Sequence, residues 1–340
     1  MARGTWLAGC RRRWRWPRWP DCKVALVIAA AAATALGLCL RHDFETQAAD
    51  EPAPPGHAVV VGIFTSYGHK SALRRRAILD TWLPQSDSAD VRFVFVIGDP
   101  PARHRQLHGD DSSSDGKRWS TGAVQTQVTH GRLLHLDGVE DTYANLPRKS
   151  AAFFTAAAAL ARKFIIKVDD DIYFRPAVLP TAIARWKHAR AGYIGCLKSG
   201  KVETRSEYKW HEPRAALFGD ALMYPTHAWG SSYALSAATA ASIAALNGGG
   251  AGLRLLSNED VAVGLWALAT GAVFLDDRRL CAPTCEGGAL SVWDLSCTGL
   301  CSVEAQAELH GQPSCRAPLA AIDTARDADL YAPFYSFEDR

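Results

Sequence analysis

Apolar runs of strand length alternate with segments of helical length after His57, and this alternation constrains the fold more than any other feature. The strand-like runs are AVVVGIFTS, VRFVFVIGD, RLLHLDGV and FIIKVDDD, and the helical segments between them are KSALRRRAILDTWLP and LPRKSAAFFTAAAALARK. Continuous apolar runs are typical of strands buried on both faces, and helical connections allow such strands to run parallel. The sequence therefore predicts an α/β fold with a mostly parallel sheet flanked by helices.

Composition narrows the functional classes. The 340 residues are 48% hydrophobic and 21% charged, which is an ordinary globular balance. The formal net charge of +3 is too small to indicate a nucleic-acid surface, so no nucleic-acid partner is expected. Neither a G-x-G-x-x-G nor a G-x-x-x-x-G-K-[ST] motif occurs, which argues against a dinucleotide-binding fold and a P-loop nucleotidase.

The N-terminus predicts a membrane anchor. Residues 24–40 form an uncharged apolar run of 17 residues after a basic tail at 1–23, and a polar, proline-rich stem follows at 41–56. As a helix the run would be roughly 26 Å long, just short of the ~30 Å hydrocarbon core of a bilayer. The basic residues before it orient the N-terminus to the cytosol and the remaining chain to a lumen. A cleaved signal peptide and an Ala-rich amphipathic helix are the alternatives, but the run is long for the first and has no polar stripe for the second.

Cysteine placement agrees with a lumenal domain. Six of the nine cysteines follow the apolar run, and an even number in an oxidising compartment indicates disulfide bonds. The two C-x3-C pairs leave zinc binding as an alternative, although structural zinc sites usually have a tighter spacing. The sequence leaves the pairing open among 15 connectivities. The six residues are Cys196, Cys281, Cys285, Cys297, Cys301 and Cys315.

Three adjacent carboxylates, Asp169, Asp170 and Asp171, end the run FIIKVDDD. Ligands bind beyond the carboxyl ends of parallel strands, and we expect Thr65, Ser66 and Asp99 on the same edge. Adjacent like charges repel by about 1 kcal/mol in water and by more in a cleft. Carboxylates at this position suit Mg²⁺ or Mn²⁺ that holds a diphosphate. An acidic surface turn or a helix N-cap is the alternative interpretation.

A second acidic pair, Glu259 and Asp260, begins an apolar segment of helical spacing, SNEDVAVGLW. Carboxylates in a first helical turn are stabilised by the helix dipole, which is one explanation for the pair. The functional alternative is a general base that removes a proton from an acceptor hydroxyl. We expect only one of the two side chains to point into a cleft.

Six motifs then carry a resemblance to a known family. Their order and spacing across about residues 57–315 resemble the β-1,3-galactosyltransferases, a family that also includes fringe-like N-acetylglucosaminyltransferases, and the cysteine-rich end looks most like the plant and green-algal branch. The motifs are RRRAILDTW, VDDDIYF, KWHEP, SSYALS, NEDVAVG and DDRRLC.

The resemblance implies a GT-A fold in a single-pass type II Golgi membrane protein whose catalytic domain, residues 57–315, faces the lumen. It implies a manganese-dependent, inverting transfer of galactose from UDP-galactose to a sugar hydroxyl of a glycan or glycoprotein acceptor. A β-1,3-N-acetylglucosaminyltransferase and a non-catalytic lumenal sugar-binding protein are the alternatives. The tail, residues 316–340, contains no recognisable motif.

The resemblance also assigns roles to single residues. Asp169 and Asp171 form the D-x-D motif, with Asp171 the direct metal ligand, and Asp260 takes the place of the base with Glu259 beside it. The predicted donor-binding residues are Arg74 and Arg76 or their neighbours, together with Asp169, Asp170, Thr65 and Ser66. The predicted acceptor-binding residues are Trp229, Trp210 and Glu212.

Two departures from the family pattern matter. Trp229 stands where a small residue is usual, and a tryptophan there suits either a sugar face or the core. Phe274 and Leu275 occupy the place of a usual histidine, which puts a third protein metal ligand in doubt and leaves His227 and His211 as candidates.

Overall fold

The computed structural model describes residues 56–85, 87–88, 90–101, 132–248, 252–286, 288–293 and 302–316. All of them belong to the compact unit Pro55–Arg340. The predicted basic tail, membrane anchor and C-terminal tail, nearly all of the stem, and Cys297 and Cys301 lie outside the described residues. In the part of the chain that is described, no helix is both long and apolar enough to cross a membrane.

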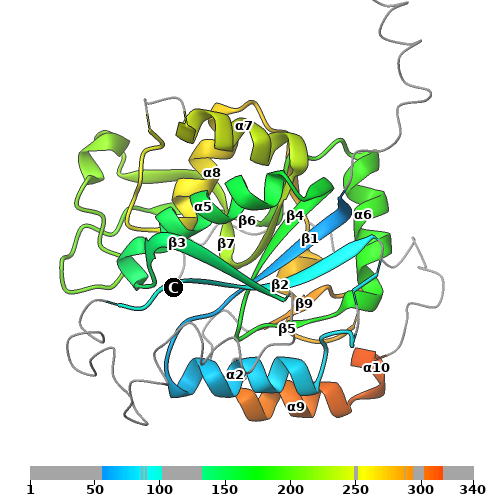
Figure 1. Cartoon of the computed structure of the whole chain (residues 1–340). Helices are drawn as coiled ribbons and strands as arrows, with labels where there is room; N and C mark the ends of the chain where they lie inside the picture. The colour runs from blue at the N-terminus through cyan, green and yellow to red at the C-terminus, as the bar shows by residue number, and fades with distance from the viewer. Residues whose placement is uncertain are drawn as a thin grey trace, which may run out of the picture. The chain divides into compact units, whose positions relative to one another are not determined.

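The described strands form a seven-stranded sheet in the order β3-β2-β1-β4-β7-β6-β8 (Figure 1). All neighbours pair in parallel except β7, which runs antiparallel to β4 and to β6. A separate two-stranded sheet pairs β5 (Tyr173–Phe174) with β9 (Ser291–Val292). The mostly parallel sheet predicted from the sequence is confirmed. The large sheet contains β1 (His57–Phe64), β2 (Val91–Asp99), β3 (Leu133–Glu140), β4 (Ala161–Asp169), β6 (Tyr193–Lys201), β7 (Met223–Ser236) and β8 (Phe274–Asp276).

Helices cover both faces of this sheet (Figure 1). One layer contains α5 (Leu146–Ala158), α7 (Ala237–Gly248) and α8 (Glu259–Ala269), and the other contains α2 (His69–Asp80), α6 (Leu179–His188) and α9 (Val303–Gly311), with the short α10 (Pro313–Arg316) at its end. The described 3₁₀ turns are η2 (Tyr143–Asn145), η3 (Pro176–Val178), η4 (Ala215–Phe218) and η5 (Arg278–Cys281).

The core is split by the sheet. Along β1, Val59 and Ile63 pack into the cluster under α2 and α6, while Val60 and Phe64 pack into the cluster under α5 and α8. Both clusters bury their members almost completely, which is why β1 is a continuous apolar run without alternation.

The structure differs from the sequence-based expectation at the end of one helix. The helical segment expected to run to Lys163 ends at Ala158, and β4 begins at Ala161. Ala161 pairs with His57 at the start of β1, so sheet pairing overrides the high helix propensity of Ala, Arg and Lys here.

Two disulfide bonds join distant segments. Cys196 in β6 bonds to Cys281 in η5, and Cys285 bonds to Cys315 in α10. Four of the six cysteines are therefore in disulfides, as predicted, and Cys281 and Cys285 do not form the zinc pair that their spacing allowed.

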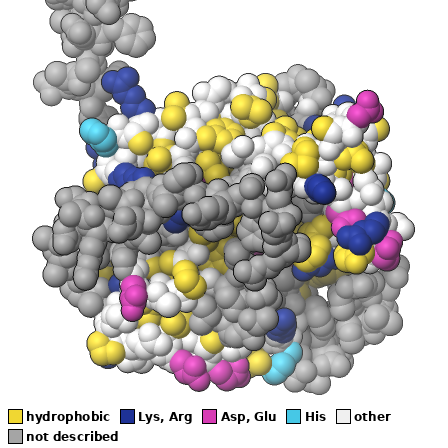
Figure 2. Space-filling model, turned by 180° about the vertical axis from the view of Figure 1, so that it is seen from behind, with side chains coloured by type: hydrophobic (Ala, Val, Ile, Leu, Met, Phe, Trp, Pro, Cys, Tyr) yellow, Lys and Arg dark blue, Asp and Glu magenta, His cyan; other side chains and the backbone are white. Residues whose placement is uncertain are grey.

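Figure 2 shows the opposite side of the molecule, with lysine and arginine side chains scattered among acidic, polar and apolar ones. The described part of that face therefore carries no continuous basic patch.

Candidate active site

Two adjoining cavities lie at the carboxyl edge of the parallel strands. The smaller has a volume of about 310 Å³ and is lined by Thr65, Ser66 and Arg74 among others. The larger has a volume of about 900 Å³ and contains the acidic pair that begins α8. Asp169 and Tyr143 line both cavities, so the predicted D-x-D motif lies at their junction.

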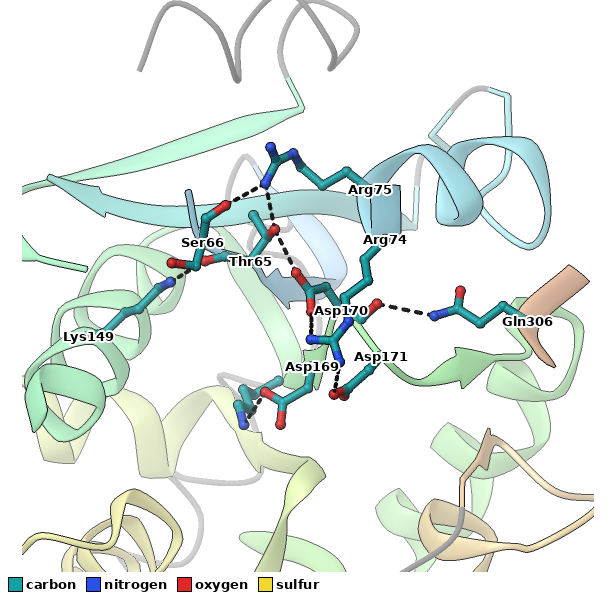
Figure 3. A network of polar contacts seen from close by, with 10 residues as sticks. Thr65, Ser66, Arg74, Arg75, Lys149, Asp169, Asp170, Asp171 and Gln306 are labelled. Carbon is teal, nitrogen blue, oxygen red and sulfur yellow. Dashed lines mark hydrogen bonds and ion pairs between the residues drawn. The ribbon is translucent and has the colours of Figure 1, made fainter. Parts of the chain in front are cut away.

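The three consecutive aspartates have different partners (Figure 3). Asp170 accepts hydrogen bonds from the Thr65 hydroxyl at 2.8 Å and from Arg74 Nη1 at 2.9 Å. The other terminal nitrogen of Arg74 donates to Asp171 at 2.7 Å. Arg74 thus pairs with two carboxylates, and Thr65 lies at the same edge of the sheet as the aspartates, as expected from the sequence.

Burial leaves two of these carboxyl groups difficult to ionise. It raises the pKa of Asp170 to about 6 although Arg74 and Thr65 favour the charged form. It also raises the pKa of Asp169 to about 7, a shift that Lys167 opposes and the neighbouring carboxylates of Asp171 and Glu259 reinforce. The repulsion expected from the sequence is therefore present and only partly compensated.

A buried lysine lies beneath the junction of the cavities. Lys167 precedes Asp169 by two residues on β4, so both side chains point to the same face. Its Nζ lies 2.7 Å from Asp169 Oδ1 and 3.8 Å from Glu259 Oε2, and it donates to the Gly230 carbonyl. Burial disfavours the ammonium, but the carboxylates of Asp169 and Glu259 outweigh it and raise the pKa of Lys167. Lys167 thus links the D-x-D motif to the second acidic pair.

The two acids of that pair have different surroundings at the N-terminus of α8. The Glu259 side chain is only 7% exposed and accepts hydrogen bonds from the hydroxyls of Ser150 and Tyr233. The Asp260 side chain is 18% exposed and lines the larger cavity, with Oδ2 3.5 Å from Lys198 Nζ. Asp260 is thus the more accessible proton acceptor, and Glu259 is anchored.

The two predicted acceptor-binding tryptophans both line the larger cavity. Lys198 Nζ lies 3.6 Å from the centre of the Trp229 ring, and Trp293 packs against that ring edge to face. Trp210 is 50% exposed at the rim. The sequence allowed Trp229 to be either a sugar contact or a core residue. Its ring lines the cavity and also packs against Trp293.

Glu212 does not line either cavity. It is 1% exposed, and its two oxygens accept from the backbone amides of Arg214 and Ser257. Its carboxylate holds the loop after β6 against the start of α8, which leaves it no oxygen facing an acceptor sugar.

Arg76 also lies outside both cavities. Its side chain is 74% exposed and pairs with Asp80 one turn along α2. The neighbouring Arg75 is buried instead and donates to the Thr65 hydroxyl at 2.9 Å and the Ser66 carbonyl at 2.6 Å. Consecutive helical residues point about 100° apart, so the sequence showed that three arginines could not share a face but not which ones face inward.

Sequence reasoning missed several cavity residues. Lys149 in α5 is buried and donates to the Thr65 carbonyl at 2.6 Å and to Asp141 at 2.8 Å. Lys167 was visible as a single charge between the apolar residues Ile166 and Val168 of a buried strand, which is a signal of function. Lys198 and Tyr143 gave no comparable signal.

The donor set at the cavity junction fits a divalent cation. Asp169 and Asp171 offer hard oxygen ligands, and a cation would offset the burial and the neighbouring carboxylates of Asp171 and Glu259 that raise the pKa of Asp169. Among the histidines considered from the sequence, His227 Nδ1 contacts the Pro225 carbonyl at 2.8 Å and its Nε2 lies 4.0 Å from Asp260. His227 therefore lies beside the acidic pair and not with the D-x-D carboxylates.

Another potential ligand group among the described residues is Asp99, His135 and Asp137. His135 contacts Asp99 at 3.0 Å through Nε2 and Asp137 at 2.8 Å through Nδ1. This group lines neither cavity, and the Asp137 side chain is 93% exposed. Asp99, which the sequence placed on the edge with Thr65, thus contacts β3 and not the D-x-D motif.

The parallel sheet, the acidic strand end and the adjoining cavity with a second acidic pair are the arrangement expected of a glycosyltransferase. A family model described as Galactosyltransferase matches residues 73–277. The chain belongs to this galactosyltransferase family, and the resemblance and the hexosyltransferase class predicted from the sequence are confirmed.

Similar proteins include two from Arabidopsis thaliana. Probable beta-1,3-galactosyltransferase 12 is 37% identical over 75% of this chain and 66% of its own length. Probable beta-1,3-galactosyltransferase 13 is also 37% identical, over 75% of this chain and 71% of its own length. The chain thus spans about two thirds of these relatives.

A solved structure, mannosyltransferase PcManGT from Pyrobaculum calidifontis in complex with GDP-Man and Mn²⁺, is 15% identical. The match covers 74% of this chain and 66% of that one, with a TM-score of 0.34.

Proposed function

We propose that this protein transfers galactose from UDP-galactose to a hydroxyl of a glycan or glycoprotein acceptor, forming a β-1,3 linkage with inversion, on a GT-A fold. The observation that carries the proposal is the meeting of two cavities at Asp169, with the accessible carboxylate of Asp260 in the larger one. The donor and the linkage are supported by the names of the relatives, probable beta-1,3-galactosyltransferases 12 and 13.

The smaller cavity is the proposed donor site. Arg74 and Lys149 line it, each paired with a carboxylate, and the side chains of Thr65 and Ser66 add hydroxyl groups. A nucleoside diphosphate suits these groups because guanidinium binds phosphate oxygens in a bidentate manner. Phosphate oxygens would compete with Asp170 and Asp171 for Arg74, which pairs with both in the structure.

Asp169 and Asp171 would hold a divalent cation, which we propose is Mn²⁺. When bound, such an ion supplies positive charge that neutralises the diphosphate as the sugar bond breaks. Lys167 holds Asp169 in place from beneath, and Arg74 does so for Asp171.

Asp260 is the proposed general base. Its Oδ2 accepts the proton of the acceptor hydroxyl, whose oxygen then attacks the anomeric carbon while the bond to UDP breaks. Lys198 Nζ lies 3.5 Å from the same oxygen and pairs with the carboxylate. A single displacement inverts the anomeric centre, so no covalent nucleophile is needed.

We further propose that the enzyme is a single-pass type II protein of the Golgi membrane with this domain in the lumen, acting in protein glycosylation. The uncharged run at residues 24–40 and the family resemblance support this localisation. The two disulfides among the described cysteines are consistent with an oxidising compartment.

The test is UDP release by the purified chain with UDP-galactose and, separately, UDP-N-acetylglucosamine, with and without Mn²⁺. We expect Mn²⁺-dependent release from UDP-galactose that Asp171→Ala abolishes and Asp137→Ala leaves intact, because Asp137 is exposed and lines neither cavity. Turnover with UDP-N-acetylglucosamine but not with UDP-galactose would mean that UDP-N-acetylglucosamine is the donor. If neither donor releases UDP, even after acceptors are added, the result would favour a non-catalytic sugar-binding protein.

A further inference from the structure

The rim of the larger cavity carries an ammonium group between two exposed aromatic rings. Lys209 Nζ lies 4.7 Å from the centre of the Trp210 ring and 5.9 Å from the centre of the Tyr143 ring. Both rings are 50% exposed, and all three side chains line the cavity. We call Tyr143, Lys209 and Trp210 the rim cluster.

The charge at the rim is open to a ligand. Within the described ranges, no carboxylate lies within ion-pairing distance of Lys209, and its ammonium contacts only the two aromatic rings there. The lysine farther into the cavity differs, because Lys198 lies 3.5 Å from Asp260. Among the described residues, no carboxylate therefore neutralises the positive charge of the rim cluster.

The rim cluster is held in a fixed relation to the acidic pair. The Asn258 side chain donates to the Trp210 carbonyl at 3.2 Å and to the Tyr224 hydroxyl at 3.1 Å, and Asn258 directly precedes Glu259 in the chain. On the other side of the cluster, Tyr143 lies near Asp260. Burial raises the pKa of the Tyr143 phenol, and the carboxylate of Asp260 raises it further. The rim and the proposed base thus belong to one site.

The cavity holds a second aromatic surface at Trp229, where Lys198 lies over the ring. Trp229, Lys198 and Asp260 suffice for a sugar whose hydroxyl is to be deprotonated. The volume of about 900 Å³ lies near the top of the usual range for ligand pockets, so the cavity extends well beyond one such sugar. An aromatic ring with an open face binds the apolar face of a sugar, and a lysine beside it binds an anionic substituent.

We propose that the rim cluster is an outer acceptor subsite that binds a second, negatively charged sugar unit, so the acceptor is an acidic oligosaccharide and not a single neutral sugar. This inference rests on the proposed galactosyltransferase function. In the bound complex the outer ring stacks on Trp210 and its carboxylate or other anionic group pairs with Lys209, while the inner sugar lies against Trp229 with its hydroxyl at Asp260.

Three probes test the subsite with the full chain, UDP-galactose and Mn²⁺. They are methyl β-galactoside, the corresponding β-linked digalactoside, and that disaccharide with the outer C6 oxidised to a carboxylate. We expect KM to fall from the first probe to the second and again to the third, by about threefold to tenfold at each step, with kcat little changed, because stacking and an exposed ion pair are each weak contributions.

Variants separate the two contributions. Trp210→Ala should raise KM for both disaccharides by about tenfold and Trp210→Phe should restore most of the loss, whereas Lys209→Met should raise KM only for the charged probe. Tyr208→Ala is the matched control for Trp210, because Tyr208 is 41% exposed in the same loop but does not line the cavity. Lys163→Met, at the exposed amino end of β4, is the control for Lys209.

UDP release without acceptor distinguishes this inference from the proposed function. If UDP release from UDP-galactose is intact, any of three results would overturn the outer subsite. They are equal KM values for the three probes, unchanged KM in the rim variants, and no transfer to any probe. Loss of Mn²⁺-dependent UDP release in the wild type would count against the proposed function itself.

Discussion

Replacing Lys167 by methionine should destabilise the fold through the acidic site that it supports. Its Nζ lies 2.7 Å from Asp169 and 3.8 Å from Glu259, which corresponds to gross attractions of about 6 and about 4 kcal/mol at an effective dielectric constant of 20. Burial of the ammonium offsets much of this, and breaking a buried pair typically costs roughly 3–5 kcal/mol. Because the Asp169 side chain is 37% exposed, water replaces part of the interaction, so we expect a loss of about 3 kcal/mol.

Urea unfolding of the wild type, Lys167→Met, Asp169→Asn and the double variant at pH 8 measures this loss. The double variant should recover part of the stability, because it removes the uncompensated charge of Asp169 and leaves only Glu259 without the ammonium. Lys163→Met serves as the control, since Lys163 is an exposed lysine on the same strand. A loss below about 1 kcal/mol for Lys167→Met, or a double variant no more stable than the single one, would refute the compensation argument.

The remaining predictions concern catalysis, pH and the disulfides. Asp260→Asn should lower kcat of transfer roughly 10²–10⁴-fold with an unchanged urea midpoint, whereas a near-normal rate would remove Asp260 as the base. The donor kcat/KM should rise between about pH 6 and pH 8, because the pKa of Asp169 is raised to about 7 and only the carboxylate ligates a cation; a flat profile would contradict this. The same raised pKa means that the contribution of Asp169 to stability is fully present below its ordinary pKa and is lost as pH rises through about 7. Replacing both Cys285 and Cys315 by serine opens a loop with a sequence separation of 30. The free energy of unfolding should fall by about 3.6 kcal/mol, as measured by denaturation without reducing agent. An unchanged midpoint would show that the bond does not constrain the unfolded chain.

The parts of the fold that follow from local pattern were predictable. β2 has the predicted bounds, Val91–Asp99, and β4 ends in the predicted acidic cluster, because a strand buried on both faces needs an uninterrupted apolar run. The cluster could be placed at the ligand-binding edge for the same reason. Parallel strands bring their carboxyl ends together whatever their order in the sheet.

The residues that tertiary packing selects were not predictable. Arg75 and Arg76 are adjacent in one helix, and only the docking of α2 decides that the first is buried and the second points to solvent. Glu212 likewise belongs to a motif of the acceptor region, but its oxygens are used by backbone amides that lie 2 and 45 residues away. A motif fixes which residue types are present, and the long-range contacts decide which of them remain free for a ligand.

The C-terminal segment shows how far such contacts extend beyond the matched family region, which ends at residue 277. Gln306 in α9 is completely buried, and its side chain donates to the backbone carbonyl of Asp170 at 3.2 Å (Figure 3). His310 in the same helix contacts the Tyr173 hydroxyl at 3.0 Å, just after the acidic cluster. The backbone of the D-x-D turn is therefore supported from a helix that lies some 30 residues past the matched region. Because the disulfide of Cys285 and Cys315 ties the chain on both sides of this helix, α9 and its flanking cysteines belong to the scaffold of the proposed donor site.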